Sequence, residues 1–319
     1  MGSEIKLSAF ARYSWFVLIF NLLVVLWGVF LRASKSGDGC GQHWLTCHGE
    51  VIPSAPELKA VIEFSHRITS AIAFLLVAAL LIWTFKKFAK GDPIRKTALL
   101  SFIFIVTEAA LGAGLVLTGN TAETLTASRP FWMAGHLINT FILLAFLTLT
   151  ARYASGGKRL RWDVGKKFLV PIALAGLAVL IIGLSGSIAA LANMIFPSGT
   201  LAEGLVKDFS STSNVLLRLR LLHPITAILG GVFLIFLTGW MAKAAGNEKS
   251  VTKWSNILSI LVLVQLAFGS ATLFMLAPIV MQLGHLLLAD AIWISLVLFT
   301  AAFLSTESTE QTVEIVGSS

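Results

Sequence analysis

Eight long apolar stretches constrain this chain more than any other feature of its sequence. They cover about residues 14–32, 62–85, 97–118, 130–151, 168–191, 217–242, 254–277 and 279–304. A helix needs about 20 apolar residues to cross the hydrocarbon core of a bilayer. Because helices satisfy their own backbone polar groups in lipid, we predict an all-α integral membrane protein with eight transmembrane helices.

The composition excludes the other broad classes. Of the 319 residues 56% are hydrophobic and 13% are charged, whereas soluble domains carry about 25% charged residues. A soluble domain, a disordered chain and a disulfide-rich secreted scaffold are therefore excluded, and the lipid bilayer is the first partner. The net charge of +8 does not indicate a nucleic-acid partner, since its distribution along the chain follows membrane topology.

The basic residues gather on one side of the predicted spans. Cytoplasmic loops carry an excess of Lys and Arg. With the N-terminus inside, two thirds of the 24 basic residues lie in inner segments: Lys6, Arg12, Lys86, Lys87, Lys90, Arg95, Lys96, Arg152, Lys158, Arg159, Arg161, Lys166, Lys167, Lys243, Lys249 and Lys253. We therefore predict that both termini are cytoplasmic and that residues 33–61, 119–129 and 192–216 lie outside.

The two halves of the chain repeat each other. The matching elements are His66-Arg67-Ile68-Thr69 with His223-Pro224-Ile225-Thr226, Glu108 with Gln265, Gly112 with Gly269, and Gly135-His136-Leu137 with Gly284-His285-Leu286. Four spans in each half make the halves parallel repeats, and we predict two pseudo-symmetric four-helix bundles. The predicted divisions are an N-terminal bundle (1–151), a cytoplasmic linker (152–167), a C-terminal bundle (168–304) and a polar tail (305–319).

Four histidines lie within the predicted spans at one depth: His66, His136, His223 and His285. Each is about six residues inside the outer end of its helix, or roughly 9 Å below the surface. The two histidines of one half can face each other across a bundle and hold a haem iron from both sides. The alternatives are hydrogen bonds between helices or a water-filled path. Zinc is disfavoured, because neither half offers a third ligand other than Glu63.

Arginines at the outer surface are candidates for binding haem propionates. They are Arg67, Arg129, Arg218 and Arg220, and a guanidinium presents a planar fork of donors that matches a carboxylate. The alternative for each one is an anchor at the membrane interface.

Acidic residues distinguish the first half. Glu63 precedes His66 by three residues and faces the same side of the helix, whereas the equivalent position in the second half is Arg220. A carboxylate near the membrane boundary is a candidate functional group, and the alternatives are a salt bridge to Arg67 or a contact with the outer loop. Glu108 is a second unusual acid, in the middle of the third span, whose role stays open.

The two cysteines, Cys40 and Cys47, lie in the first outer loop. A disulfide is plausible in an oxidising outer compartment, as a structural staple or for redox chemistry. A c-type haem attachment is excluded, because that motif requires a cysteine where Trp44 stands.

Taken in order, these motifs resemble those of haem A synthases over essentially the whole chain. The most specific are Ser36-Gly37-Asp38-Gly39-Cys40-Gly41-Gln42-His43-Trp44-Leu45-Thr46-Cys47-His48-Gly49, Glu63-Phe64-Ser65-His66-Arg67 and the two Gly-His-Leu elements. The resemblance implies a catalytic N-terminal bundle in which His66 and His136 flank the substrate haem and Glu63 is the essential acid. It implies haem b between His223 and His285, and a disulfide between Cys40 and Cys47.

The resemblance further implies oxidation of the C8 methyl of haem O to the formyl group of haem A through an alcohol, in a bacterial cytoplasmic membrane. A haem O synthase and an electron acceptor are candidate partners. Pro224 departs from the arginine common in the family, so Arg218 or Arg220 is expected to serve the haem b propionates. The main alternative is a di-haem b-type electron-transfer protein, and a haem transporter or assembly chaperone is a more distant one.

Overall fold

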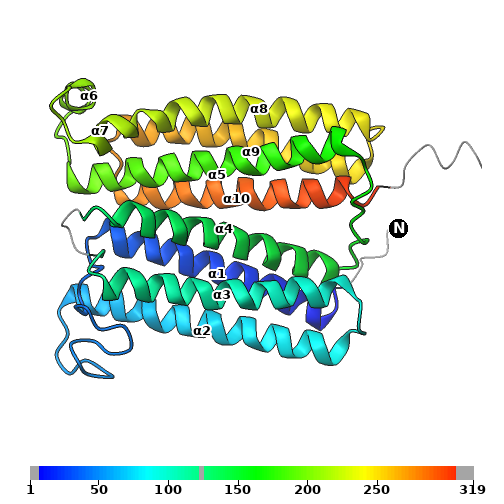
Figure 1. The fold of residues 1–319 in the computed structure, drawn as a ribbon, viewed down its shortest axis with the longest axis horizontal. Helices are drawn as coiled ribbons and strands as arrows, with labels where there is room; N and C mark the ends of the chain where they lie inside the picture. The colour runs from blue at the N-terminus through cyan, green and yellow to red at the C-terminus, as the bar shows by residue number, and fades with distance from the viewer. Residues whose placement is uncertain (1–6, 122–125, 307–319) are drawn as a thin grey trace, which may run out of the picture.

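The computed structural model describes residues 7–121 and 126–306 and is shown in Figure 1. Within these ranges the chain forms ten helices and no named strand. Eight helical spans are long and apolar enough to cross a membrane. These spans confirm the predicted all-α, multi-pass architecture. Residues 307–319, most of the predicted polar tail, lie outside the described residues, as does Lys6.

The spans fall into two groups of four. The helices of the first half are α1 (Ala9–Ala33), α2 (Leu58–Lys87), α3 (Pro93–Leu117) and α4 (Arg129–Ala154). Those of the second half are α5 (Lys166–Ile195), α7 (Val215–Arg220) continued by α8 (Leu222–Ala244), α9 (Lys249–Phe274) and α10 (Ile279–Phe303), with the short α6 (Leu201–Phe209) before α7. Figure 1 shows the two groups packed side by side, with the loop after α1 and the helix α6 at the same end of the molecule.

Seven of the eight spans begin before the apolar stretch that predicts them, whereas α9 ends at Phe274, before the predicted end at residue 277. Ser8 and Asp92 cap α1 and α3 by accepting hydrogen bonds from backbone N–H groups of the first turn, as N-cap side chains commonly do. The helix α4 continues to Ala154 and α5 begins at Lys166, so the segment that joins the halves is shorter than the predicted linker.

The sixth span is interrupted where the sequence predicts one continuous helix. The break falls at Leu221, between α7 and α8, and it places Pro224 in the first turn of α8. Proline is tolerated there because it lacks only an N–H that has no partner within the helix. The corresponding segment of the first half carries Arg67 in place of Pro224, and α2 runs through it without a break.

The seam between the halves is formed chiefly by α4 and α10, which are the most buried of the spans. The helix α10 packs against both α4 and α1, and α4 also packs against α5. Trp293 of α10 stacks on Phe141 of α4 with 5.4 Å between ring centroids, and its indole N–H donates to the Phe141 carbonyl at 2.7 Å. Each seam helix also carries one of the four histidines, His136 on α4 and His285 on α10.

A second set of contacts joins the halves where α4 and α10 end. Arg152, in the last turn of α4, donates to the Ala301 carbonyl at 3.2 Å and to the Ser305 hydroxyl at 2.8 Å. The backbone N–H of Arg161, in the segment between α4 and α5, donates to the Leu304 carbonyl at 2.8 Å. The joining segment is thus bound to the end of α10.

Candidate functional site

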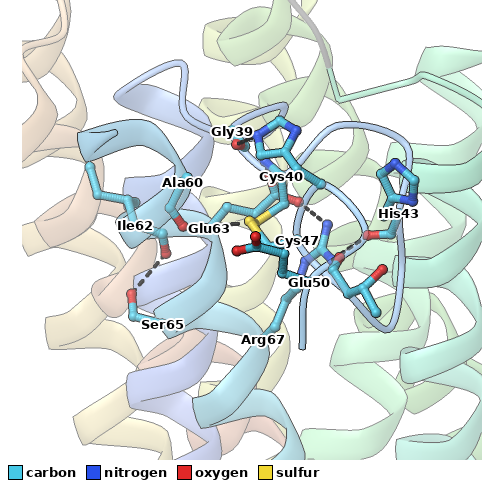
Figure 2. The surroundings of a disulfide bond; sticks show 12 residues. Gly39, Cys40, His43, Cys47, Glu50, Ala60, Ile62, Glu63, Ser65 and Arg67 are labelled. Carbon is cyan, nitrogen blue, oxygen red and sulfur yellow. Dashed lines mark hydrogen bonds and ion pairs between the residues drawn. A yellow bond between two sulfur atoms is a disulfide. The ribbon is translucent and has the colours of Figure 1, made fainter. Parts of the chain in front are cut away.

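The loop between α1 and α2, residues 34–57, is the predicted first outer loop, and it folds over the start of α2 as a compact unit. A disulfide joins Cys40 to Cys47, as the resemblance predicts, and both cysteines are fully buried. Figure 2 shows the disulfide above the first turns of α2, where the Cys40 sulfur lies 3.8 Å from the Ala60 carbonyl oxygen. His48 closes the loop through a 2.8 Å contact between its Nε2 and the Gly39 carbonyl.

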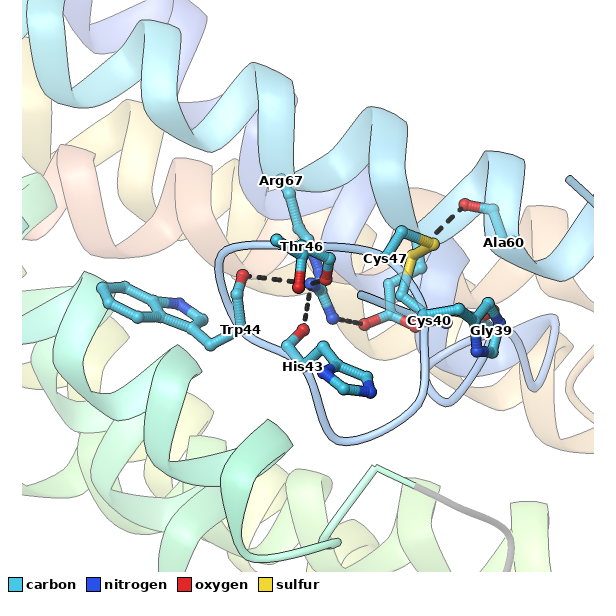
Figure 3. Close-up of polar contacts among 10 residues, drawn as sticks. Gly39, Cys40, His43, Trp44, Thr46, Cys47, Ala60 and Arg67 are labelled. Carbon is cyan, nitrogen blue, oxygen red and sulfur yellow. Dashed lines mark hydrogen bonds and ion pairs between the residues drawn. A yellow bond between two sulfur atoms is a disulfide. The ribbon is translucent and has the colours of Figure 1, made fainter. Parts of the chain in front are cut away.

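Arg67, on α2, forms hydrogen bonds with the backbone of this loop. Its Nη1 donates to three backbone carbonyls, those of His43, Trp44 (3.0 Å) and Thr46 (2.8 Å), and Figure 3 shows these oxygens gathered around the guanidinium. Its Nη2 pairs with Glu63. Most of the N–H donors of Arg67 are therefore already bonded within the chain. A propionate bound by Arg67, as predicted, would share the guanidinium with the loop carbonyls and Glu63.

Glu63 lies where α2 meets the loop, and its side chain is almost completely buried. Its Oε2 accepts the backbone N–H of Cys40 at 2.7 Å, and its Oε1 accepts from Arg67. Both alternatives for Glu63, a salt bridge and a contact with the outer loop, are thus present. A carboxylate has about four lone-pair sites, so these two contacts leave Glu63 able to accept a further proton or hydrogen bond.

The four histidines have similar positions in their spans. His66 is the ninth residue of α2, His136 the eighth of α4 and His285 the seventh of α10, while His223 is the ninth residue from the start of α7. His66 and His136 lie close enough to interact electrostatically. The rings of His223 and His285 are 6.0 Å apart between centroids and nearly perpendicular.

Glycines on neighbouring helices make room for three of these rings. A Cβ atom added at Gly28, Gly186 or Gly269 would lie 3.1, 3.0 or 2.9 Å from the Cε1 atom of His66, His223 or His285, respectively. Such distances are tighter than ordinary van der Waals contact, so even alanine would displace the imidazoles. His136 is the exception, since nothing lies within 4 Å of a Cβ at Gly112. Its ring instead lies beside Glu108, with 3.5 Å between Nδ1 and Oε2.

Hydrogen bonds orient the two histidines of the second half. His223 Nδ1 lies 3.2 Å from the Ser185 hydroxyl, which leaves its Nε2 for a ligand. Gln265 donates to the His285 backbone carbonyl at 3.0 Å, and its Nε2 lies 3.3 Å from that ring's Nε2.

The remaining arginines lie at the outer end of the molecule. Arg220 donates to Asp208 at 2.5 Å, to Asn193 at 2.7 Å and to the Gly204 carbonyl at 3.2 Å, which binds α6 to α5 and α7. Arg218 is exposed, whereas Arg129 is buried at the start of α4 with its Nη2 4.0 Å from the sulfur of Met194.

The helix α6 lies within the loop that joins α5 to α7. It presents Leu205, Val206 and Phe209 outward, each more than half exposed. A hydrogen bond from Lys207 holds the pKa of Glu203, in the first turn of α6, below its ordinary value. This charge pair lies on the solvent-exposed outside of the loop.

The donor set fits haem better than a metal ion bound by side chains alone. Among residues 7–121 and 126–306, no three His, Cys, Asp or Glu side chains come together as a metal site would require. Two imidazole nitrogens that bound an iron from opposite sides at about 2.0–2.1 Å each would be separated by about 4 Å. The 6.0 Å between the His223 and His285 centroids is compatible with that spacing. The buried Nδ1 atoms of His66, His136 and His285 have no hydrogen-bond partner within the described residues.

Three residues of structural interest were missed by the sequence reasoning. Gly28 and Gly186 receive the rings of His66 and His223, and the signal for them was a glycine at corresponding places in two apolar spans. Asp290 is a fully buried acid within α10, and neither of its oxygens has a hydrogen-bond partner in the described part of the chain. An acid within an apolar span is itself a signal of this kind.

Fold and site together define a class: a multi-pass helical membrane protein whose two halves each offer a pair of histidines at one depth. Residues 11–297 match the COX15-CtaA family, described as cytochrome oxidase assembly protein. The chain belongs to this family, which confirms the predicted resemblance.

Curated relatives carry two names. The haem A synthase of Shouchella clausii is 29% identical over 281 residues, covering 85% of this chain and 89% of that protein. The haem A synthase of an Exiguobacterium species is 41% identical over 107 residues, covering 34% of this chain and 36% of its own. The protoheme IX farnesyltransferase of Thermus thermophilus is 42% identical over 304 residues, or 95% of this chain and 49% of that protein. The chain thus spans about half the length of this last relative.

Proposed function

We propose that this chain is a haem A synthase, which oxidises the C8 methyl of haem O to a formyl group through an alcohol. Membership of the family supports an enzyme that acts on haem. The observation that carries the proposal is the asymmetry between the halves. Both halves offer two histidines, but only the first has a buried carboxylate, Glu63, hydrogen-bonded to a disulfide loop above them. A protein that only relayed electrons would have no need of this difference.

The division of labour follows from that asymmetry. The N-terminal bundle, up to residue 151, is the catalytic one, with the substrate haem between His66 and His136. The C-terminal bundle, residues 168–304, holds haem b between His223 and His285. When bound there, haem b supplies an electron carrier, because an iron with two histidine ligands has no open position for chemistry.

Glu63 is the acid that serves the reaction. Oxidising the methyl to the formyl group with water as the source of oxygen releases four electrons and four protons, and the electrons pass to the electron acceptor that is a candidate partner. Removing electrons from a methyl group conjugated to the macrocycle develops positive charge beside the ring, which an ionised carboxylate stabilises. The same carboxylate can take a proton from an attacking water. The Cys40 N–H and Arg67 keep the carboxylate in place at the outer end of α2.

Propionate binding falls to the outer arginines. Arg67 and Arg129 serve the substrate haem, and Arg218 or Arg220 serves haem b. Arg218 has the most exposed side chain of the four, whereas Arg67 and Arg220 also bind their outer loops.

The chain lies in a bacterial cytoplasmic membrane with both termini in the cytoplasm. The outer face then carries the disulfide loop and α6, and the inner face carries the basic segment between α4 and α5. An oxidising compartment outside this membrane suits the Cys40–Cys47 disulfide.

The farnesyltransferase relative favours a second candidate function. That protein is named for farnesyl transfer to protohaem, and this chain matches about half of it. In our proposal farnesyl transfer is the reaction of a partner, a haem O synthase, and this chain acts on the product.

The test is to express the full chain with and without a source of haem O and to identify the extracted haems by chromatography and mass. Haem A or its alcohol precursor, formed only with haem O, supports the proposal. Haem O formed from protohaem and a farnesyl donor by the chain alone would support the farnesyltransferase function. Two unmodified haem b groups in every condition would support electron transfer.

A further inference from the structure

Glu108 is an intramembrane acid that the proposed function leaves without a task. It lies in α3, nine residues before the helix ends at Leu117, and its side chain is only 16% exposed. An acid at this depth is costly unless donors surround it. Its contacts therefore indicate what it does.

Polar side chains of α4 donate to both carboxylate oxygens of Glu108. The amide of Asn139 donates to Oε2 at 2.6 Å, and the hydroxyl of Thr140 donates to Oε1. The orientation of Asn139 is fixed from both sides, because its amide also donates to the Phe104 carbonyl at 2.9 Å and its oxygen accepts from the Thr107 hydroxyl at 2.6 Å. Both oxygens of a carboxylate accept hydrogen bonds, so these two donors fit the Glu108 side chain in this orientation.

His136 completes this cluster. Its Nδ1 lies 3.5 Å from Glu108 Oε2 and is buried, with no hydrogen-bond partner within the described residues. A histidine that binds a metal through one nitrogen usually donates the N–H of the other to a carboxylate or carbonyl, which fixes its tautomer and raises its basicity as a ligand. The nearest group suited to that role for His136 is Glu108.

The second half has no such cluster. The position of Glu108 is taken by Gln265, a neutral amide that donates to the His285 backbone carbonyl at 3.0 Å. The positions of Asn139 and Thr140 correspond to Leu288 and Ala289, neither of which can donate from its side chain. The difference therefore involves a whole group of residues on two helices, and its electrostatic effect falls on the first half alone.

We propose that Glu108 is a positioning residue for His136 that also sets the redox properties of the first haem site. Its carboxylate accepts the Nδ1–H of His136, which turns Nε2 toward the haem iron. Its negative charge stabilises the ferric iron and makes the reduction potential of this haem lower than it would be beside a glutamine. This inference rests on the proposed function, because it requires a haem bound through His136.

The experiment is a spectroelectrochemical titration of the haem-loaded full chain, with the midpoint of each haem followed separately. Glu108→Gln is the main variant, since the second half shows that a glutamine fits at the equivalent position. We expect the midpoint of the first-half haem to move to more positive potential, with a change in its ferric electron paramagnetic resonance signal, while the second-half haem stays unchanged.

Thr140→Val provides a test in the opposite direction. It removes one hydrogen-bond donor from Glu108 with little change in volume, so the carboxylate accepts a stronger hydrogen bond from the His136 N–H. The midpoint of the first-half haem should then move to more negative potential. Loss of structure alone would not give shifts of opposite sign in the two variants.

Two results would overturn the inference, and they differ in what else they affect. An unchanged first-half midpoint in Glu108→Gln, with haem still bound through His66 and His136, overturns this inference and leaves the proposed function standing. If His136→Ala removes no haem from the chain, both the inference and the proposed haem site are wrong.

Discussion

The two halves of this protein share a helix plan but arrange their outer charges in opposite ways. In the first half the acid Glu63 stands on the spanning helix and pairs with Arg67 one turn below. In the second half the equivalent helix position is Arg220, and its acid partner, Asp208, comes from the outer helix α6. Each pair binds an outer loop to its bundle, yet only the first places a carboxylate on the helix that carries a histidine.

The features that the two halves share hold the fold together, and the features that differ are those suited to chemistry. An arginine–carboxylate pair holds the outer loop in each half. In the first half both members stand on the spanning helix, whereas in the second half the spanning helix carries only the arginine. A carboxylate on the histidine helix, a disulfide above it and a second acid behind the other histidine occur together in the first half alone. In the proposed function, these few changes to a duplicated scaffold give one copy the reaction and the other a supporting role.

Replacing the Glu63 carboxylate is expected to have the largest effect on the difference between the two halves. Glu63→Gln should retain both haems but lose turnover by about 10²–10⁴-fold, the usual contribution of a general acid or base. The measurement is haem A formed per bound haem. The matched control is Glu203→Gln, which neutralises an exposed outer acid of the second half and should leave turnover unchanged. Normal haem A formation by Glu63→Gln would show that the acid is only structural.

Removing the arginine tests whether the first outer loop depends on Arg67. Arg67→Met strips donors from three carbonyls and leaves Glu63 buried without its cation, which should cost on the order of 3 kcal/mol. Thermal unfolding and proteolysis within residues 34–57 measure the effect. Arg67→Lys keeps the charge but not the fork of donors, so an intermediate loss is expected. Equal stability of Arg67→Met and the parent chain would contradict the contacts described.

Removing the disulfide should leave the first outer loop, like the loop between α5 and α7, without a covalent cross-link. Replacing both Cys40 and Cys47 by alanine is expected to lower stability by about 2–3 kcal/mol, since the bond closes a short loop. Cleavage of residues 34–57 by a protease should become faster, while the absorption spectrum of the second-half haem stays the same. Reducing agent should reproduce the change in the parent chain and add nothing in the variant.

The smallest expected effects come from substitutions of the glycines beside the histidine rings, tested in both halves, with Gly112→Ala as the control. Gly186→Ala should displace His223 and cost about 1–3 kcal/mol through overpacking, and it should reduce haem retention in the second half. Gly28→Ala should do the same for the first half through His66. Gly112→Ala meets no neighbouring atom and should leave retention unchanged. Unchanged haem retention in Gly28→Ala and Gly186→Ala would mean that the positions of these two rings do not depend on the glycines.

Much of the fold follows from the sequence, because lipid imposes a simple rule on long apolar stretches. All eight predicted spans are present, and the pairing of Cys40 with Cys47 agrees with the resemblance. The break at Leu221 was not predicted, since periodicity and hydropathy do not register one irregular peptide within an apolar run. Its signal was Pro224, which the sequence reasoning treated only as a missing arginine.

The site was less predictable, because contacts between distant segments determine it. The sequence indicates that Glu63 and Arg67 share a helix face, but not that Arg67 binds three carbonyls of a loop more than twenty residues earlier. Likewise, Glu108 stands out as an acid in a span, while its donors Asn139 and Thr140 become relevant only when α3 packs on α4. The roles of the candidate residues toward haem stay predictions.

The seam position of α10 affects the order in which the protein can be completed during synthesis. Spans are made from the N-terminus onward, so the surfaces of α1 and α4 that α10 covers remain exposed to lipid until α10 is inserted. Trp293 and the inner contacts of Arg152 and Arg161 form only at that moment. A nascent chain that stops before α10 therefore lacks more than His285: its first half, although fully translated, is left without the helix that packs against it.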